Sequence, residues 1–166
     1  FIPMCNFFSA IVKRSGEVLW IPESDNYEEI IKKYELKDDK IKNKKWCRVK
    51  RVPPDISSEV FEKMEFDKWN FKIDEEEIDW MKNAHIKSVQ NAVKIFIEKH
   101  VVSKNNFKEE IDEYIRFNFG SIQFVRNGGK VHEVRDGGTV QTVRDCGTVH
   151  EVWGGGTVQT VRDGGT

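Results

Sequence analysis

The C-terminal third of the chain repeats a nine-residue unit, and this repeat constrains the fold more than any other feature. From residue 118 onward, five complete units and a four-residue remainder read NFGSIQFVR, NGGKVHEVR, DGGTVQTVR, DCGTVHEVW, GGGTVQTVR and DGGT. Each unit joins a glycine-containing segment to the pattern Val-x-x-Val, with Ile122 in place of the first valine in the first unit. Units this short bury apolar side chains only by stacking on neighbours, which predicts an elongated β structure.

A longer period of 18 residues underlies the nine-residue unit. The sixth position is Gln at 123, 141 and 159, and His at 132 and 150, so like units alternate. If two units make one coil, like residues stack about 4.8 Å apart. The alternative is an antiparallel meander, because Asp-Gly favours hairpin turns. A meander leaves the alternation unexplained and separates the paired valines, so we predict a flattened parallel β-solenoid over 118–166.

The solenoid hypothesis assigns a place to each position of the unit. The glycine pairs form corners, where the second glycine needs a positive φ or a close backbone approach. The valine pairs fill the interior. Arg126, Arg144 and Arg162 form a ladder on one side, each followed by Asn or Asp, which offsets repulsion between the cations. On the other side Arg135 lies below Trp153, where a cation–π contact is expected.

Residues 4–117 have the pattern of a small α+β domain, an antiparallel sheet with two or three helices. Aromatic and β-branched residues predict strands over 6–13, 18–21, 46–52 and 69–73. Ser24 and Asp25 are candidate caps for a helix that follows with helical apolar spacing. A long helix is predicted over 78–100, and a shorter one over 107–115 leads into the repeat. The predicted fold class is thus α+β followed by a short parallel β-solenoid.

Charge and cysteine usage exclude several classes of protein. With 27 basic and 28 acidic residues, the chain lacks the basic excess of a general nucleic-acid binder. Cys5, Cys47 and Cys146 are widely spaced and form no Cys-x-x-Cys motif, so no disulfide framework, zinc site or cofactor is predicted. Reduced thiols and the lack of a long apolar run favour a cytoplasmic protein. The opening Phe-Ile-Pro-Met suggests that the natural start is Met4.

Two features of the front part invite a functional interpretation. The carboxylates of residues 74–79 (DEEEID) include enough acids to bind a hard cation, but we interpret them as the favourable charge at a helix start. His85 falls on the apolar stripe of that helix without a second ligand nearby, which indicates a buried structural histidine. The charge run over 37–45 is interpreted as a solvated loop.

The order of these segments resembles a known family. An opening MCNFFSAIV at 4–12, then GEVLW at 16–20, then DEE at 74–76 and GGTVQ-type repeats are similar to small phage and prophage proteins. Those proteins join an uncharacterised N-terminal domain to a variable number of solenoid repeats. The resemblance implies an origin in a mobile element. It also implies an accessory role such as binding and disabling a host factor, CRISPR effectors included. Resemblance to calcium-binding RTX nonapeptides is limited to unit length and paired glycines.

We therefore predict a non-enzymatic binding protein that inhibits a bacterial defence complex through a protein or protein–RNA surface. Interfaces concentrate binding energy in Trp, Tyr and Arg. On that basis the predicted partner-binding residues are Trp46, Arg48, Lys50, Arg51, Arg126, Arg144, Trp153 and Arg162. The last strand of the repeat presents an unpaired edge, and such edges recruit partners. Self-association into a homodimer is predicted through Thr157, Val158, Gln159, Thr160, Val161 and Arg162.

Two alternative functions remain open at this stage. The first is a nucleic-acid-binding accessory protein, in which residues 42–51 and the arginine ladders contact phosphates. The second is a metal-dependent enzyme that uses the carboxylates of 74–79. The sequence favours the enzyme less, because no nucleophile and base accompany those carboxylates.

Overall fold

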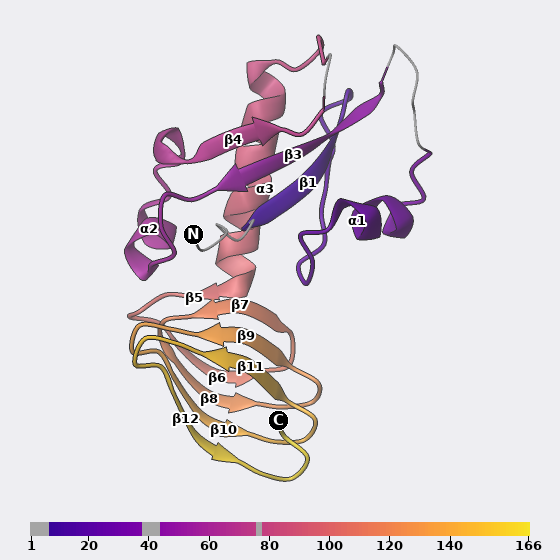
Figure 1. Ribbon diagram of the computed structural model, residues 1–166. Coiled ribbons are helices and arrows are strands. Elements are labelled where there is room, and N and C mark those ends of the chain that lie inside the picture. The colour runs from indigo at the N-terminus through magenta and orange to yellow at the C-terminus, as the bar shows by residue number, and fades with distance from the viewer. Residues whose placement is uncertain (1–6, 38–43, 76–77) are drawn as a thin grey trace. The chain divides into compact units, whose positions relative to one another are not determined.

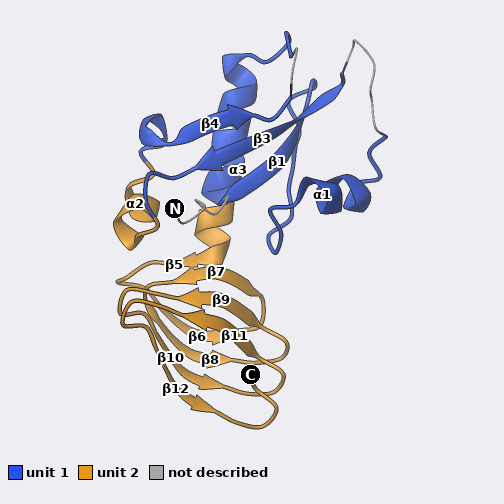
Figure 2. Ribbon diagram, in the orientation of Figure 1, with its two compact units in different colours: residues 1–55, 65–95 blue, residues 56–64, 96–166 orange. Residues whose placement is uncertain are grey.

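The computed structural model describes residues 7–37, 44–75 and 78–166, which form two compact units (Figures 1 and 2). Unit 1 comprises 1–55 and 65–95, and unit 2 comprises 56–64 and 96–166. The expected start at Met4, most of the charge run and residues 76–77 of the acidic cluster lie outside the described residues.

Unit 1 is built on a four-stranded antiparallel sheet in the order β2-β1-β3-β4. Its central strands are aromatic and β-branched, and five of the six residues of β1 are buried, which explains why this segment forms a strand. All four predicted strands are confirmed, as β1 (Phe8–Lys13), β2 (Val18–Leu19), β3 (Trp46–Val52) and β4 (Asn70–Ile73).

The helices of the front part follow the predicted apolar spacing, with corrections at their starts. Helix α1 (Tyr27–Lys33) is capped by Asn26 and not by Ser24 or Asp25, because the Asn26 Oδ1 accepts the Glu28 amide at 2.9 Å. Helix α3 (Asn83–His100) begins later than residue 78, so the acidic cluster precedes the helix. A 3₁₀ turn, η1 (Phe66–Lys68), precedes β4.

Unit 2 contains the predicted parallel β-solenoid. Successive strands alternate between two parallel four-stranded sheets, in the orders β12-β10-β8-β6 and β11-β9-β7-β5 (Figure 1). The register joins residues 18 apart, for example Val140 with Val158, so like units stack on like units as predicted. The repeat strands are β8 (Ser121–Val125), β9 (Lys130–Val134), β10 (Thr139–Val143), β11 (Thr148–Val152) and β12 (Thr157–Val161).

The solenoid begins before the expected boundary at 117/118, and the helix predicted over 107–115 is wrong. β6 (Phe107–Ile111) and β7 (Tyr114–Asn118) pair in parallel with the repeat strands β8 and β9, and β5 (Val101–Val102) pairs in parallel with β7. Apolar residues three or four positions apart indicated a helix at 107–115. The same spacing serves the interior of a coil, where Ile111 and Ile115 join the valine core.

The corners explain the glycines of the repeat. At the corner before β10, Gly137 has φ +82°, a conformation that residues with a Cβ rarely adopt. At Gly138 an added Cβ would lie 2.2 Å from the carbonyl oxygen of Asn118 in the coil below. The first corner residue is also left-handed, at +49° for Asp136. Asp and Asn tolerate this region, which supplies a reason for them beyond charge balance.

A short helix, α2 (Ser58–Lys63), belongs to unit 2 although the repeats begin far along the chain. Its Phe61 is buried and stacks on Phe117 with ring centroids 5.5 Å apart, and it contacts Phe119 at 6.0 Å. The Lys104 amide donates to the Ser58 hydroxyl at 2.8 Å. Helix α2 therefore contacts the first coil at Lys104 and the next coil at Phe117 of β7, so it covers the start of the solenoid.

Candidate interaction surfaces

The strand β3 does not present the exposed partner-binding surface that its sequence suggested. Trp46 is 8% exposed and its Nε1 donates to the Lys37 carbonyl at 3.2 Å. Arg51 is 4% exposed, and its Nη1 donates to the carbonyls of Trp69 at 2.9 Å and Phe66 at 3.1 Å. Both side chains therefore support the fold of unit 1, and their prediction as exposed contact residues is wrong.

The remaining basic residues of β3 are engaged by the acidic cluster. Arg48 pairs with Glu75 at 2.5 Å, and Lys50 with Asp74 at 3.0 Å, while Lys44 also contacts Glu75. Burial would raise the pKa of Asp74, but hydrogen bonds from Lys50 and the Tyr27 hydroxyl outweigh it and lower that pKa. Among the described residues no group of three or more His, Cys, Asp or Glu side chains is arranged to hold a metal ion.

Replacing Arg51 with methionine is expected to destabilise unit 1 by about 1–3 kcal/mol. The cost arises because the substitution leaves buried carbonyl groups without donors. Urea denaturation of the purified variant measures it. The control is Lys72→Met on β4, at an exposed position, where the free energy of unfolding should change by less than about 0.5 kcal/mol. Equal stability of the two variants would contradict a structural role for Arg51.

His85 is confirmed as a buried histidine. Its Nδ1 accepts the Lys82 amide at 3.1 Å, its Nε2 lies 3.0 Å from the Arg14 carbonyl, and its ring packs on Trp80. Because both ring nitrogens contact backbone groups, the geometry fits a structural histidine.

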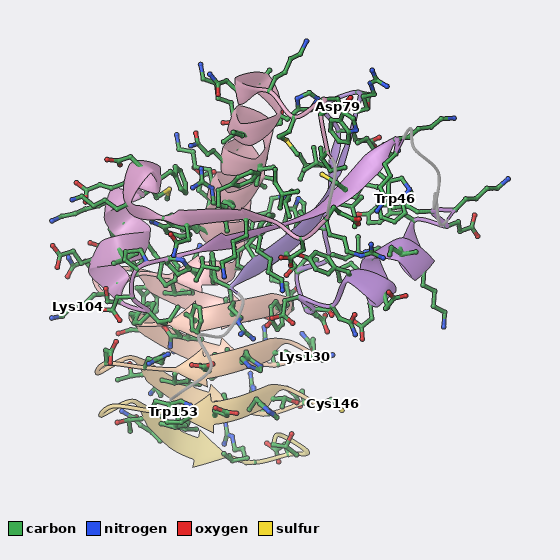
Figure 3. The ribbon with its side chains drawn as sticks, turned by 45° about the horizontal axis from the view of Figure 1, so that its top comes forward. Trp46, Asp79, Lys104, Lys130, Cys146 and Trp153 are labelled. Atoms are coloured by element: carbon green, nitrogen blue, oxygen red, sulfur yellow. The ribbon has the colours of Figure 1, made fainter. Side chains whose placement is uncertain are left out.

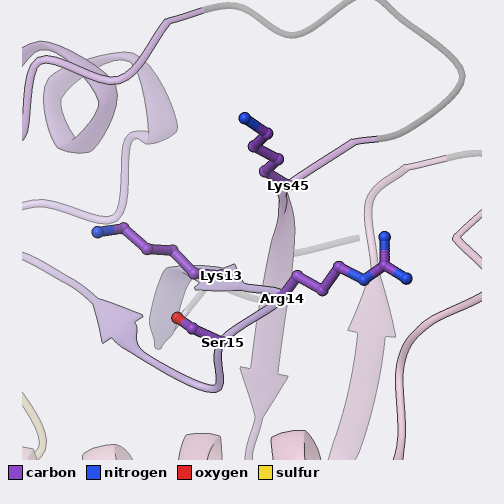
Figure 4. A pocket seen from close by; sticks show the side chains of 4 residues that line it. All are labelled: Lys13, Arg14, Ser15 and Lys45. Carbon is purple, nitrogen blue, oxygen red and sulfur yellow. The ribbon is translucent and has the colours of Figure 1, made fainter.

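Unit 1 also has an open pocket of about 740 Å³ beside the β1–β2 turn. Figure 4 shows that its basic side chains point in different directions rather than toward one point. Lys13 is paired with Glu17 at 2.5 Å. The pocket can therefore attract an anion but does not present a convergent set of ligands. The residues that line it are Lys13, Arg14, Ser15 and Lys45.

The arginine ladder is present on the β6-β8-β10-β12 sheet. The register aligns Val125, Val143 and Val161, and each of these valines precedes an arginine. Arg126 donates through two nitrogens to Glu110, at 2.5 Å each. Arg144 lies over the Phe124 ring at 4.7 Å. Arg162 has a side chain 53% exposed and lies 3.6 Å from Asp163, so it is the most accessible member of the ladder.

The β11-β9-β7-β5 sheet carries a row of ionisable side chains. The rings of His132 and His150 stack at 5.1 Å with an interplanar angle of 18°, which follows from the 18-residue register. Arg135 lies over Phe117 at 5.9 Å, so the expected contact with Trp153 is wrong. Phe117 lies in the coil on the opposite side of Arg135 from Trp153. Burial raises the pKa of the adjacent Glu133.

The raised pKa of Glu133 gives stability a defined pH dependence. The pKa of Glu133 is higher in the folded chain than in the unfolded chain. The stability that the protonated carboxyl contributes is therefore fully present below the unfolded-state pKa and is lost as pH rises through the folded-state pKa. The stability of Glu133→Gln relative to wild type should therefore increase with pH across this window and level off above the folded pKa. Urea denaturation at several pH values measures the difference. The exposed Gln141 on β10 provides a control as Gln141→Glu, for which the difference should stay flat.

The last coil differs from the inner ones in exposing apolar side chains. Val140 and Val143 are 0% exposed, whereas Val161 at the position equivalent to Val143 is 54% exposed. Val152 and Trp153 are 48% and 54% exposed, and Figure 3 labels Trp153 on this part of unit 2. β11 and β12 are the outermost strands of their sheets in the described chain. Together they form a surface that we call the last-coil face: Val152, Trp153 and residues 157–162.

Comparison with known proteins found no match to any family model, curated protein or solved structure. None of the helices among the described residues combines the length and apolarity that a membrane-crossing helix requires.

Cys47 is a buried free thiol, and burial raises its pKa to about 12, while Cys146 is free and exposed. Sequence reasoning missed the structural roles of Trp46 and Arg51. The alternation of apolar and basic residues in β3 predicted a strand but did not indicate which of these side chains are buried.

Proposed function

We propose that this protein is a non-enzymatic binding protein that self-associates through the last-coil face. The observation that carries the proposal is the exposure of Val152, Trp153 and Val161 together at the outer strands of both sheets. An exposed strand edge with apolar flanks recruits another chain, because pairing satisfies backbone groups and buries the apolar surface. In this proposal the partner-binding residues that keep an accessible position are Trp153 and Arg162.

For the biological target we propose a host defence complex in the cytoplasm of a bacterium that carries the element. This target follows from the resemblance of the sequence segments to small phage proteins, whose expected two-part architecture is an α+β unit followed by a solenoid. Balanced charge favours a protein or protein–RNA surface over bare nucleic acid.

Capture of partners from a bacterial lysate, together with an interference assay against a CRISPR effector, tests this proposal. Wild-type protein should retain a defined host complex and protect phage DNA from it. Val161→Lys, which places a charge at the β12 edge, should abolish self-association in sedimentation experiments. Gln141→Lys on the inner strand β10 is the matched control and should behave as wild type. If Val161→Lys still self-associates and still retains the host complex, the last-coil face does not have the proposed role.

The second candidate is binding of nucleic acid, and the basic pocket of unit 1 favours it. Lys13, Arg14 and Lys45 line that pocket together. If they contact phosphates, retention of DNA or RNA should fall steeply with salt, and Arg14→Gln with Lys45→Gln should reduce the slope of that dependence by about 2. Absence of any retention at low salt would exclude this candidate.

A further inference from the structure

We propose that His132 and His150 together bind a divalent transition-metal ion of the class that prefers imidazole, such as Cu²⁺, on the outer face of the β11-β9-β7-β5 sheet. The two imidazoles come from neighbouring coils, and water completes the coordination of the ion. This inference does not depend on the self-association proposed above, because it concerns the face of a sheet and not the edge of one.

The register of β9 and β11 brings the two imidazoles together. The two strands pair in parallel with Thr148 opposite Lys130 and Val149 opposite Val131, so the next residue on each strand is a histidine. The two rings stack with their centroids 5.1 Å apart and an angle of 18° between their planes. Backbone pairing fixes the spacing of neighbouring strands. The distance between the imidazoles is therefore set by the solenoid itself, before any ion binds.

This spacing is close to what one metal ion requires. A metal–imidazole bond is about 2.0–2.1 Å long, so two nitrogens bound to one ion lie at most about 4.2 Å apart. The stacked rings must tilt toward each other to direct their lone pairs at a shared ion. Their exposure permits this movement, since the side chain of His132 is 29% exposed and that of His150 is 63% exposed.

The carboxylates that follow the two histidines favour a cation at this place. Oε1 of Glu133 lies 3.8 Å from Nε2 of His132, and Oε1 of Glu151 lies 3.8 Å from Nε2 of His150. The other oxygen of each carboxylate accepts a hydrogen bond from the ninth residue of its own unit, at 3.2 Å and 2.6 Å. Two negative charges are thus held beside the imidazole nitrogens. They act through charge and not as ligands, since the described residues contain no group of three metal-ligating side chains.

The chemistry of the pair selects the kind of ion. Neutral imidazole suits Cu²⁺, Ni²⁺ and Zn²⁺, and Cu²⁺ binds most tightly of these to a given set of nitrogen ligands. Ca²⁺ and Mg²⁺ prefer oxygen ligands. The other histidines of the chain, His85 and His100, are buried and contact backbone groups. The stacked pair is therefore the place where this chain offers two imidazoles to one ion.

Titration of the purified wild-type chain with Cu²⁺, followed by calorimetry and electron paramagnetic resonance, tests the proposal. One equivalent should bind and give the hyperfine pattern of two nitrogen ligands, and excess Ca²⁺ should not displace it. His150→Gln should weaken binding by about tenfold or more and leave a single-nitrogen pattern. Glutamine occupies the same position in three of the five units, so this substitution suits the repeat.

An exchange of two residues provides the matched control. His150→Gln combined with Gln141→His keeps four histidines but moves one imidazole to β10, which belongs to the opposite sheet. This variant should bind Cu²⁺ as weakly as His150→Gln alone, and circular dichroism verifies that both keep the wild-type fold. Equal affinity of the exchanged and wild-type chains would overturn the proposal. So would the absence of Cu²⁺ binding to the wild-type chain, or a wild-type pattern with one nitrogen.

Glu151→Gln tests the role of the carboxylates separately. Removing one negative charge beside the imidazoles should weaken Cu²⁺ binding by about tenfold while the two-nitrogen pattern remains. Unchanged affinity in this variant would show that the carboxylates do not assist the ion. Loss of the two-nitrogen pattern would show instead that Glu151 is itself a ligand, which would overturn a site made of two imidazoles and water.

Discussion

Replacing Gly138 with alanine should lower the free energy of unfolding of the solenoid by more than about 3 kcal/mol, at the severe end for a single substitution. The added Cβ would lie 2.2 Å from the Asn118 carbonyl oxygen and 3.0 Å from that of Arg135. Both obstacles are backbone atoms, one in the coil below and one in the same corner, so the corner cannot relax by turning a side chain. Relief requires that the coils separate, which breaks the hydrogen bond from the Thr139 amide to Gly120.

The neighbouring glycine offers a matched control. Gly137 has φ +82° but open space around its Cβ position, and the equivalent corner residue Cys146 already carries a side chain at +63°. Gly137→Asn should therefore cost no more than about 1 kcal/mol, because asparagine adopts left-handed conformations readily. Urea denaturation followed by circular dichroism measures both variants. Similar losses at 137 and 138 would show that φ, and not backbone clearance, controls the corner.

The second large effect is expected at Phe61, where alanine should destabilise unit 2 by about 3–5 kcal/mol. The ring is 1% exposed and stacks on Phe117, so its removal leaves a cavity against the first coil. The first coil would then lose its cap, and hydrogen exchange of β5 and β7 amides should accelerate more than that of β10 amides.

Phe107 provides the comparison for this prediction. It is also a phenylalanine near the first coil, on β6, but it is 63% exposed. Phe107→Ala should therefore change the free energy of unfolding by less than about 0.5 kcal/mol. If both phenylalanines proved equally replaceable, helix α2 would not act as the cap of the solenoid.

Much of the solenoid was predictable because each coil repeats the same arrangement of interior valines and corner residues. The valines at positions such as 140 and 143 form the interior, and the 18-residue alternation sets which residues stack. His132 against His150 follows from that alternation alone. Prediction failed where the repeat degenerates. At 107–115 the same apolar spacing fits a helix and a coil, and only pairing with β8 and β9 decides between them.

The candidate surface could be predicted less well than the fold. Composition pointed to Trp46 and Arg51 as contact residues because both types are common in interfaces. Burial decides otherwise, since Arg51 is held by carbonyls of a segment 15 and 18 residues away. Trp153 and Arg162 kept their expected exposure, because they lie on the outermost coil, where no further strand of the described chain covers them.

The repeat pattern was sufficient to predict the parallel stacking of the coils, their register and their corners, because these depend on contacts between similar neighbouring units. Tertiary structure alone decided that α2 covers the first coil, that the acidic cluster binds the basic residues of β3, and that the solenoid begins at β5. Those contacts join segments far apart in the chain. No local pattern encodes them, because their energy comes from side chains that meet only after both segments have folded.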